Sequence, residues 1–183
     1  MLTVKTLETD RIFLRQWEDG DSARLYDLAK DPQIGPRAGW PVHKDVEDSR
    51  EIIRTVLRAP ETYAVILKES GLPVGSVGLK EPEVRFRNIS EDALQMEIGY
   101  WLGREYWGNG LIPEAVQTLL SHGFEEVGCS VIWCAHYDFN TQSRRVIEKS
   151  GFVYQMTKDT TNLLGETHKT LFYALTKEDW QKL

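Results

Sequence analysis

Apolar residues recur along the chain with two different periods, and each period predicts one kind of element. Short runs that alternate or are almost wholly apolar, rich in β-branched and aromatic residues, predict strands. Stretches whose apolar residues recur every three to four positions predict helices. The expected strands are 11–17, 62–67, 74–79, 94–103, 131–135, 152–156 and 169–175. The expected helices start near positions 19–21, 45, 112 and 140.

Capping and stop residues set the limits of these helices. Asp19 or Asp21 can cap the first helix, because a short acidic side chain accepts hydrogen bonds from the first N–H groups. Asp45 begins the second helix, which is expected to run through Leu57. The expected buried face of that helix comprises Val46, Ile52, Ile53, Val56 and Leu57. Gly151 suits the left-handed position that stops the last helix.

Two stretches are expected to be loops. Residues 35–43 read Gly-Pro-Arg-Ala-Gly-Trp-Pro-Val-His, which holds too much glycine and proline for a helix or a strand. This stretch carries Trp40 and His43, so it is interpreted either as a binding loop or as a connector with Trp40 in the core. Residues 81–91 are polar with scattered apolar positions and are the second expected loop.

The order of these elements predicts an α/β fold with a mixed sheet and helices on both faces. Hairpins connect the strands that precede 94–103, so the neighbour of that strand on this side is antiparallel. No internal repeat, low-complexity run or linker divides the 183 residues, which are enough to bury one core. We therefore expect one domain over residues 1–183.

The strand at 94–103 leads through a glycine turn into the helix at 112, and this unit is the strongest candidate for a ligand site. Gly108 and Gly110 allow a tight turn with exposed N–H groups, and Pro113 suits the first turn of the helix. N–H groups at the start of a helix bind anions, most often phosphate. The alternative is an ordinary strand-to-helix turn, since glycine marks turns generally.

Two nucleotide-binding patterns do not fit this turn. A mononucleotide P-loop needs Gly-x-x-x-x-Gly-Lys-Ser/Thr, a string that the sequence lacks. A dinucleotide fingerprint needs a third glycine where Pro113 stands. The pyrophosphate of coenzyme A is the remaining phosphate ligand that suits a strand, a Gly-x-Gly turn and a helix.

Composition narrows the class of protein without identifying a function. A hydrophobic fraction of 41% and a charged fraction of 27% are typical of a soluble globular protein. The first residues lack the apolar segment of a signal peptide, and a cytoplasmic location is expected. Cys129 and Cys134 are expected to be free thiols in that compartment. The four histidines show no metal-ligand spacing, so no metal is expected.

The net charge of −6 argues against nucleic-acid binding, which requires a basic face. It also means that a polyanion such as coenzyme A would need a locally positive site. Arg104, Arg144, Arg145 and Lys149 lie near the candidate segments and could supply that field. Solvated surface charge is the alternative interpretation for at least half of them.

Two motifs resemble those of the GCN5-related N-acetyltransferases (GNAT). Segment 97–102, Glu-Ile-Gly-Tyr-Trp-Leu, followed by segment 106–110, Tyr-Trp-Gly-Asn-Gly, is similar to the acetyl-CoA-binding region of that family. More narrowly, it resembles the branch that acetylates ribosomal-protein N-termini, the RimJ/RimL type. Segments 140–143, Asn-Thr-Gln-Ser, and 148–152, Glu-Lys-Ser-Gly-Phe, resemble a second motif of this branch. The resemblance extends from the Leu-Glu-Thr-Asp-Arg string at 7–11 to the last strand.

The resemblance implies acetyl-CoA as cosubstrate and a sheet whose two central parallel strands splay apart around its pantetheine arm. It also implies cofactor contacts from the central strand, the turn, the helix start and the second motif. These contacts are Gly99, Tyr100, Trp101, Trp107, Gly108, Asn109, Gly110, Leu111, Ile112, Asn140, Ser143, Arg145 and Lys149. The loop at 35–43 would line the acceptor pocket, with Trp40 and His43 as substrate-binding residues.

Acetyl transfer to an amine also requires a base, because a free amine has a pKa near about 10. Glu97 is the best candidate, since it is a carboxylate inside an apolar strand directly before the turn. We expect it to act through water and to contact the acceptor. The alternative is an outward-facing strand residue paired with Arg or Lys.

The departing thiolate needs stabilisation, and here the sequence departs from the family pattern. Many members carry a tyrosine four residues before the Gly-Phe pair, where Ile147 stands in this chain. Ser143 matches the serine that takes this role in the N-terminal-acetylating branch, or it only makes a hydrogen bond in its helix. Glu105 is a second departure, because the family favours Arg or Gln at that position.

Together these features predict an acetyl-CoA-dependent N-acetyltransferase that uses direct attack in a ternary complex. A protein N-terminus is the expected acceptor. A small amine such as a polyamine, an amino acid or a drug is the alternative, and a non-catalytic acyl-CoA-binding module is the rival from another class. Neither nucleic acid nor a membrane is an expected partner, whereas a homodimer is compatible with the sequence.

Overall fold

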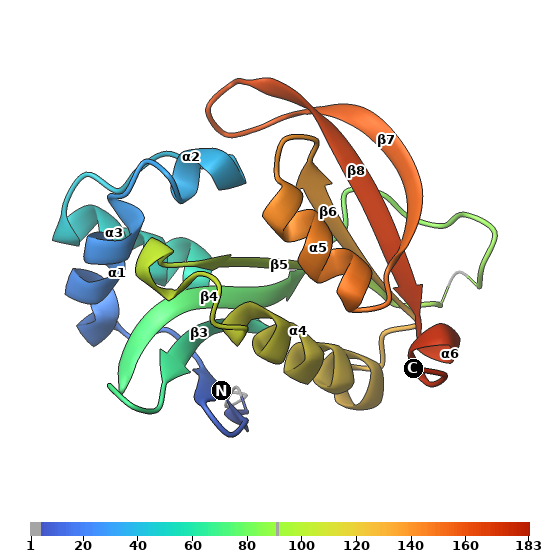
Figure 1. Ribbon diagram of the computed structural model, residues 1–183, viewed down its shortest axis with the longest axis horizontal. Coiled ribbons are helices and arrows are strands. Elements are labelled where there is room, and N and C mark those ends of the chain that lie inside the picture. Colours follow the sequence, from blue (N-terminus) through green and yellow to red (C-terminus); the bar gives the residue numbers. More distant parts are fainter. Residues whose placement is uncertain (1–4, 91) are drawn as a thin grey trace.

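Within the part of the chain that the structure describes, eight strands form a mixed sheet in the order β1-β2-β3-β4-β5-β6-β8-β7 (Figure 1). The computed structural model describes residues 5–90 and 92–183. The strands are β1 (Leu7–Glu8), β2 (Ile12–Arg15), β3 (Thr62–Leu67), β4 (Leu72–Lys80), β5 (Gln95–Leu102), β6 (Val131–Tyr137), β7 (Val153–Thr161) and β8 (Thr167–Thr176). Among these described strands, only β5 and β6 run parallel, and the other neighbours are antiparallel. The prediction of a mixed sheet, with an antiparallel neighbour on one side of β5, is confirmed.

Helices cover both faces of this sheet. They are α1 (Ser22–Ala29), α2 (Gly35–Ala38), α3 (Val46–Ile52), α4 (Leu111–His122), α5 (Thr141–Lys149) and α6 (Lys177–Trp180). Wider turns at Ile53–Leu57 and Gly123–Val127 extend α3 and α4. Over the described part of the chain, no helix has the length and apolar character needed to cross a membrane.

Strand β3 shows why both faces are covered. Its side chains alternate between the faces, as in any strand. Tyr63 and Val65 belong to the larger core, which includes α4, whereas Ala64 and Ile66 belong to a second core with residues of α1. All four residues are at most 4% exposed. A strand that is apolar on both sides is therefore stable only between two layers of helices.

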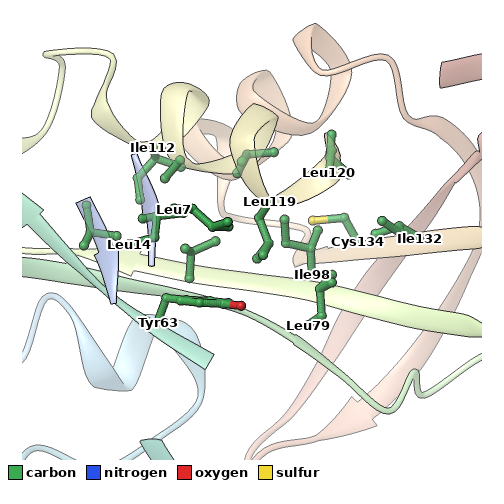
Figure 2. Packing of buried hydrophobic residues seen from close by; sticks show 14 of the residues in the cluster. Leu7, Leu14, Tyr63, Leu79, Ile98, Ile112, Leu119, Leu120, Ile132 and Cys134 are labelled. Atoms are coloured by element: carbon green, nitrogen blue, oxygen red, sulfur yellow. The ribbon is translucent and has the colours of Figure 1, made fainter. Parts of the chain in front are cut away.

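Helix α4 supplies one side of the larger core (Figure 2). Its residues Ile112, Leu119 and Leu120 face the sheet, where Ile98 and Ile132 come from the two central strands. All five side chains are at most 7% exposed. Burying each one fully contributes roughly 1.5–3 kcal/mol. This packing holds the start of α4 close to the end of β5.

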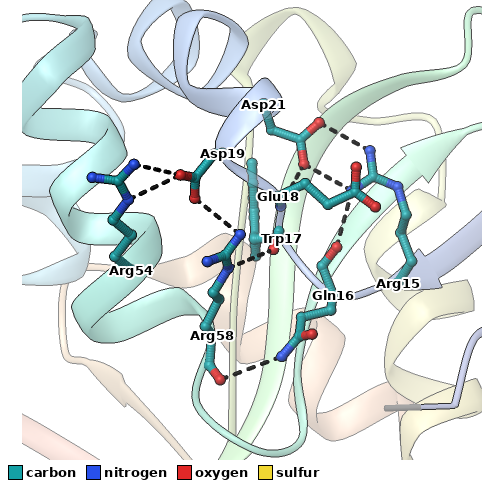
Figure 3. Close-up of polar contacts among 8 residues, drawn as sticks. All are labelled: Arg15, Gln16, Trp17, Glu18, Asp19, Asp21, Arg54 and Arg58. Carbon is teal, nitrogen blue, oxygen red and sulfur yellow. Dashed lines mark hydrogen bonds and ion pairs between the residues drawn. The ribbon is translucent and has the colours of Figure 1, made fainter. Parts of the chain in front are cut away.

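A polar cluster fixes the opposite layer where β2 leads into α1 (Figure 3). The Asp19 carboxylate pairs with Arg54 Nη2 at 2.5 Å and with Arg58 Nη2 at 2.9 Å. Arg15 donates two hydrogen bonds to the carboxylate of Asp21, at 2.7 and 2.9 Å. Asp19 or Asp21 was predicted to cap the first helix. Asp21 forms a reciprocal capping box with Glu18 just before α1, whereas Asp19 binds the two arginines.

The two central strands separate halfway along their length. Residues Gln95–Ile98 of β5 pair with Val131–Cys134 of β6, and the pairing ends there. Beyond that point, among the described strands, residues 99–102 pair only with β4 and residues 135–137 pair only with β8. The splayed central pair implied by the family resemblance is therefore present in the structure.

Two expectations about the helical layer are corrected. Residues 35–43 were expected to be irregular, but Pro36 sits in the first turn of α2 and Gly39, at φ +93°, caps its end. The side chain of Val56 was expected to be buried and is 53% exposed. The wide turn that follows α3 adds a residue to the helical turn and rotates Val56 outward. Ser49 takes a buried position on this helix instead.

The polar stretch before β5 is a loop over the described residues 81–90, as predicted, while Glu91 lies outside the described residues. Gln95 holds this loop in place through its side-chain amide. The amide donates to the carbonyl of Phe86 and accepts from the N–H of Phe86, both at 3.0 Å. The loop thereby covers Trp133, which is fully buried.

Candidate active site

Two cavities open where β5 and β6 separate. Their volumes are about 370 and 360 Å³. The residues that line both are Arg37, Ala38, Tyr100, Trp101, Asn140 and Ser143. The cavities therefore meet at the splay, with the end of β5 on one side and the start of α5 on the other.

The glycine turn borders the first cavity. Gly108 and Gly110 have φ values of +79° and +74°, in the left-handed region that favours glycine. Leu111 and Ile112 start α4, and their N–H groups precede the first intrahelical bond, which Glu114 N makes to Gly110 O. All of these residues except Glu114 line the cavity. The turn thus presents backbone donors and a helix start to this space.

A side-chain cluster that the sequence did not reveal supports this turn from outside. Arg11 donates to the carbonyl of Asn109 at 2.8 Å and forms an ion pair with Glu114 at 2.6 Å. Thr9 donates a hydrogen bond to the same carboxylate. Burial alone would raise the pKa of Glu114, but the bonds from Thr9 and Arg11 outweigh it and lower this pKa. The Leu-Glu-Thr-Asp-Arg string at 7–11 contains Thr9 and Arg11, but nothing in it indicated Glu114 as their partner.

The end of β5 presents backbone groups to the gap. Gly103 N donates to Val74 O of β4, so the alternation along the strand directs the N–H groups of Tyr100 and Leu102 away from β4. Trp107 Nε1 donates to Leu102 O at 2.9 Å, which agrees with this direction. Gly99 has no heavy atom within 4 Å of the place where a Cβ would stand. A strand edge and an open space therefore meet in the splay.

Ser143 and Tyr100 form a hydroxyl pair across the gap. Ser143 Oγ donates to the phenol oxygen of Tyr100 at 3.0 Å, and this phenol donates to Ser143 O at 3.3 Å. Asn140 caps α5 by accepting from Ser143 N at 3.2 Å. Burial raises the pKa of Tyr100, so its phenol stays protonated at neutral pH. Two hydroxyl groups from different elements are thus held at the junction of the cavities.

The second cavity contains the candidate base. Glu97 is 7% exposed and lines this cavity together with Gly99, which lies two residues further along β5. Its Oε1 lies 3.2 Å from Lys80 Nζ, and its Oε2 accepts from Glu83 N at 3.2 Å. The carboxylate is therefore buried and also paired with a lysine, so it combines features of both earlier interpretations.

Aromatic side chains form another wall of the second cavity. Trp40 and Trp101 both line it and meet edge to face with ring centroids 5.7 Å apart. Trp40 is partly buried and also packs against the core beneath α1. His43 lies behind it, with ring centroids 5.5 Å apart. Trp40 thus lines the cavity and also packs against the core, the two alternatives that the sequence left open.

His43 is not among the residues that line either cavity. Its side chain is buried and its Nδ1 lies 2.8 Å from Ser49 Oγ of α3. Burial lowers the pKa of His43, an effect that the carboxylate of Asp48 partly opposes. His43 therefore packs behind Trp40, which separates it from the second cavity.

The basic residues near the two motifs separate into different environments. Arg145 lines the first cavity. Arg104 pairs with Asp31 at 3.0 Å and Arg144 with Glu148 at 2.8 Å, while Lys149 is exposed and borders neither cavity. Arg37, which no sequence motif singled out, lines both cavities and lies over the Trp107 ring at 5.9 Å. Among the described residues, Arg37 and Arg145 are therefore the basic side chains that line the first cavity.

A backbone contact joins two distant segments above the second cavity. Leu163, in the tip between β7 and β8, donates its N–H to Gly39 O at 3.0 Å. A Cβ on Gly39 would lie 2.3 Å from the hydroxyl of Tyr137, so only glycine allows this approach. Figure 1 shows the β7–β8 hairpin reaching past β6 toward α2. The sequence gave no signal for this contact, because the residues are far apart in the chain.

The fold and this pair of cavities define an α/β acyltransferase. Residues 11–153 match the family model described as an acetyltransferase (GNAT) domain. The chain therefore belongs to the GNAT family of acetyltransferases, whose members use acetyl-CoA. The family resemblance found in the two motifs is thereby confirmed.

Individual relatives agree with this assignment. The chain is 26% identical to "Uncharacterized N-acetyltransferase p20" of Bacillus licheniformis, over 97% of this chain and 99% of that protein. It is 32% identical to "Ribosomal-protein-serine acetyltransferase" of Escherichia coli K12, over 63% of each chain. A crystal structure of a GNAT-family acetyltransferase from Bacillus anthracis superposes with a TM-score of 0.80 at 23% identity, covering 95% of this chain and 99% of the other. The last similarity supports the fold alone.

Proposed function

We propose that residues 1–183 form one catalytic domain that moves an acetyl group from acetyl-CoA to a protein N-terminal amine by direct attack in a ternary complex. The observation that carries this proposal is the junction of the two cavities at Tyr100 and Ser143. One cavity offers an anion-binding turn, and the other offers a buried carboxylate and an aromatic wall. Two substrates that enter from opposite sides can therefore meet without a covalent enzyme intermediate.

The first cavity suits coenzyme A. The N–H groups of the turn and of Leu111 and Ile112 would hold the pyrophosphate, as helix starts commonly hold phosphate. Gly108 has open space where a Cβ would stand, so a side chain there would fill the cradle. Arg145 and Arg37 would supply positive charge near the phosphates. Asn109 and Lys149 do not line this cavity, so they would act at its margin.

The gap between β5 and β6 suits the thioester arm. The outward N–H of Tyr100 can donate to a carbonyl oxygen, and a donor fixed in advance stabilises the oxyanion that forms on attack. The space beside Gly99 leaves room for the arm. Asn140, Trp101 and Trp107 would form the walls of this passage.

Glu97 would act as the base and Ser143 would assist the departing thiolate. A protonated amine must lose a proton before it can attack, and Glu97 is a buried carboxylate that lines the second cavity. Ser143 Oγ can turn its proton from Tyr100 to the sulfur as the C–S bond breaks. An alkyl thiol ionises near about 8.5, so this hydrogen bond need not transfer the proton completely.

The acceptor is the part of the proposal that rests on relatives and on charge. The E. coli relative is named as a ribosomal-protein-serine acetyltransferase, which favours a protein over a small amine as the acceptor. The N-terminal amine is the acceptor group that the motif resemblance implies. The indoles of Trp40 and Trp101 can attract a cationic amine by about 0.5–2 kcal/mol. A small amine fits the same chemistry and is the second candidate acceptor.

Release of free thiol from acetyl-CoA tests the proposal. The panel contains peptides with a free N-terminus and no lysine, the same peptides already N-acetylated, and small amines. We expect release with the free peptides, a loss of release when their N-terminus is blocked, and a loss in Glu97→Gln. If thiol is released with small amines and not with the peptides, the acceptor is a small amine and not a protein N-terminus. Tight acetyl-CoA binding without release for any amine would indicate a binding module.

A further inference from the structure

A primary amine of the protein itself already stands beside the candidate base. Lys80 is the last residue of β4 and lies directly opposite Glu97 in the antiparallel pair. Its Nζ is 3.2 Å from Glu97 Oε1, and both residues line the second cavity. Lys80 thus occupies the position that an acceptor ammonium would take.

Lys80 is free to move from this position toward the splay. Its side chain is 67% exposed, so the ammonium group can leave Glu97 without losing contact with water. Lys80 lies opposite Glu97, and Gly78 lies opposite Gly99. Glu97 and Gly99 are two residues apart on β5 and therefore share one face of the sheet. Two residues of a strand span about 6.6 Å, a distance that the flexible four-carbon stem of lysine can cover.

We propose that the protein acetylates its own Lys80 in its active site. This inference rests on the proposed function, because the acetyl donor and the base are those of the main reaction. What singles out Lys80 is that its amine, the carboxylate of Glu97 and the opening beside Gly99 share one cavity. No other lysine lines either cavity among the described residues.

The reaction balances without any further reagent. Glu97 takes one proton from the Lys80 ammonium, directly or through water, and passes it to solvent. The amine lone pair attacks the thioester carbonyl carbon, the C–N bond forms, and the C–S bond breaks with its electron pair on sulfur. The second N–H proton goes to the thiolate. The products are an uncharged Nε-acetyl-lysine, coenzyme A with a free thiol, and one proton.

Acetylation would change the second cavity. The acetylated side chain carries no positive charge, so it no longer pairs with Glu97 as an ion. The Oε1 atom of Glu97 then becomes available to an incoming ammonium, while Oε2 keeps its bond from Glu83 N. The modified protein should therefore bind a cationic acceptor better than the unmodified protein does.

Lys158 is a matched control for this lysine. Its Nζ lies 3.3 Å from Glu83 Oε1, and its side chain is 42% exposed. It therefore resembles Lys80 in its charge, its acidic partner and its access to solvent. It does not line the second cavity, so it reports the background reaction of acetyl-CoA with surface lysines.

The experiment incubates the purified full chain, first deacetylated enzymatically, with acetyl-CoA alone and follows each lysine by peptide mass spectrometry. We expect Lys80 to be acetylated at least about 10-fold faster than Lys158, at a rate per molecule that does not change on dilution. Glu97→Gln should slow the modification of Lys80 by about 10²-fold or more, the usual range for a positioned base, without changing that of Lys158. Lys80→Arg should abolish the fast component, and Lys158→Arg should leave it intact.

Two results would overturn the inference. One is acetylation of Lys80 and Lys158 at equal rates, and the other is a Lys80 rate that Glu97→Gln does not change. Failure of the inference is distinguishable from failure of the proposed function. If free-amine peptides release thiol while Lys80 stays unmodified, only the inference is wrong. If neither the peptides nor Lys80 accept an acetyl group, the proposed function is wrong as well.

Discussion

Gly99 is the position where a side chain can enter the site with little disturbance of the fold. No heavy atom lies within 4 Å of where its Cβ would stand, and its φ is outside the left-handed region. It lines the second cavity at the point where β5 and β6 separate. Gly99→Ala and Gly99→Val would therefore place a methyl or an isopropyl group in the gap.

These substitutions should not destabilise the protein. Replacing a glycine whose backbone suits other residues stabilises a protein by about 0.4–1 kcal/mol, because the unfolded chain loses freedom. Valine also fits a strand better than glycine does. In a chain of 183 residues, a gain of about 1 kcal/mol raises Tm by roughly 2–4 °C. Both variants should melt at or above the wild-type Tm.

Activity should change in the opposite direction. In the proposed function the thioester arm passes beside Gly99, so the added carbons displace it from the N–H of Tyr100 and from Ser143. A displacement of about 1 Å from the reactive geometry can cost about 10²-fold in rate. We expect kcat/KM to fall by about 10²-fold or more in Gly99→Val, and by less in Gly99→Ala.

Calorimetric melting and thiol release with a free-amine peptide measure the two effects on the same samples. Gly20→Ala is the control, because Gly20 also has open space, lacks a positive φ and lines neither cavity. It should preserve kcat/KM. Wild-type kcat/KM in folded Gly99→Val would refute the assignment of the gap to the thioester arm. A Tm several degrees below wild type would refute the open-space reasoning.

Four further predictions follow from the site. Glu97→Gln should lower the rate about 10²–10⁴-fold at neutral pH and recover at high pH, where the amine deprotonates itself; a wild-type pH profile of rate would contradict it. Trp40→Ala should raise the acceptor KM and spare acetyl-CoA affinity measured by calorimetry, whereas a large Tm loss with unchanged acceptor KM would make Trp40 purely structural. Arg11→Ala should raise the KM for acetyl-CoA roughly 10-fold, because a charge-assisted hydrogen bond to the carbonyl of Asn109 contributes about 1.5 kcal/mol; unchanged KM would exclude this support. Because burial lowers the pKa of His43 below 6.5, its unfolded form binds more protons and stability should fall as pH drops through 6.5; His43→Gln should flatten that part of the Tm profile.

The elements predicted from the sequence are those whose signal is local. The helix of α4 and the strands β3 and β5 are long, apolar and flanked by turn residues, so the pattern of single segments was enough. The short α2 was missed because glycine and proline normally break helices, whereas here Pro36 and Gly39 occupy the two ends that tolerate them. The outward position of Val56 was missed because the wide turn after α3 changes the helical period.

The part of the site that was missed depends on contacts between distant segments. Arg11 reaches Glu114 and Asn109 across about a hundred positions of sequence, and nothing near Arg11 indicates that partner. The contact between Leu163 and Gly39 likewise joins a hairpin tip to a helical turn. Arg37 carried no signal of its own, because its stretch was interpreted as an acceptor-binding loop or as a connector. Such contacts depend on how the strands are ordered in the sheet, and the pattern of a single segment does not show that order.

The hydroxyl pair at the junction offers a physical reason why this chain can lack the tyrosine that many GNAT members carry on the helix of the second motif. Ile147 at that position is 1% exposed and belongs to the larger core, so it cannot reach the gap. Tyr100 instead supplies a phenol from β5, and Ser143 supplies the hydroxyl from α5. Because burial keeps the phenol protonated, Tyr100 retains a proton that it donates to Ser143 O, and this orients the serine. In our proposal, the role of one acidic side chain is then divided between a serine that contacts sulfur and a tyrosine that positions the serine.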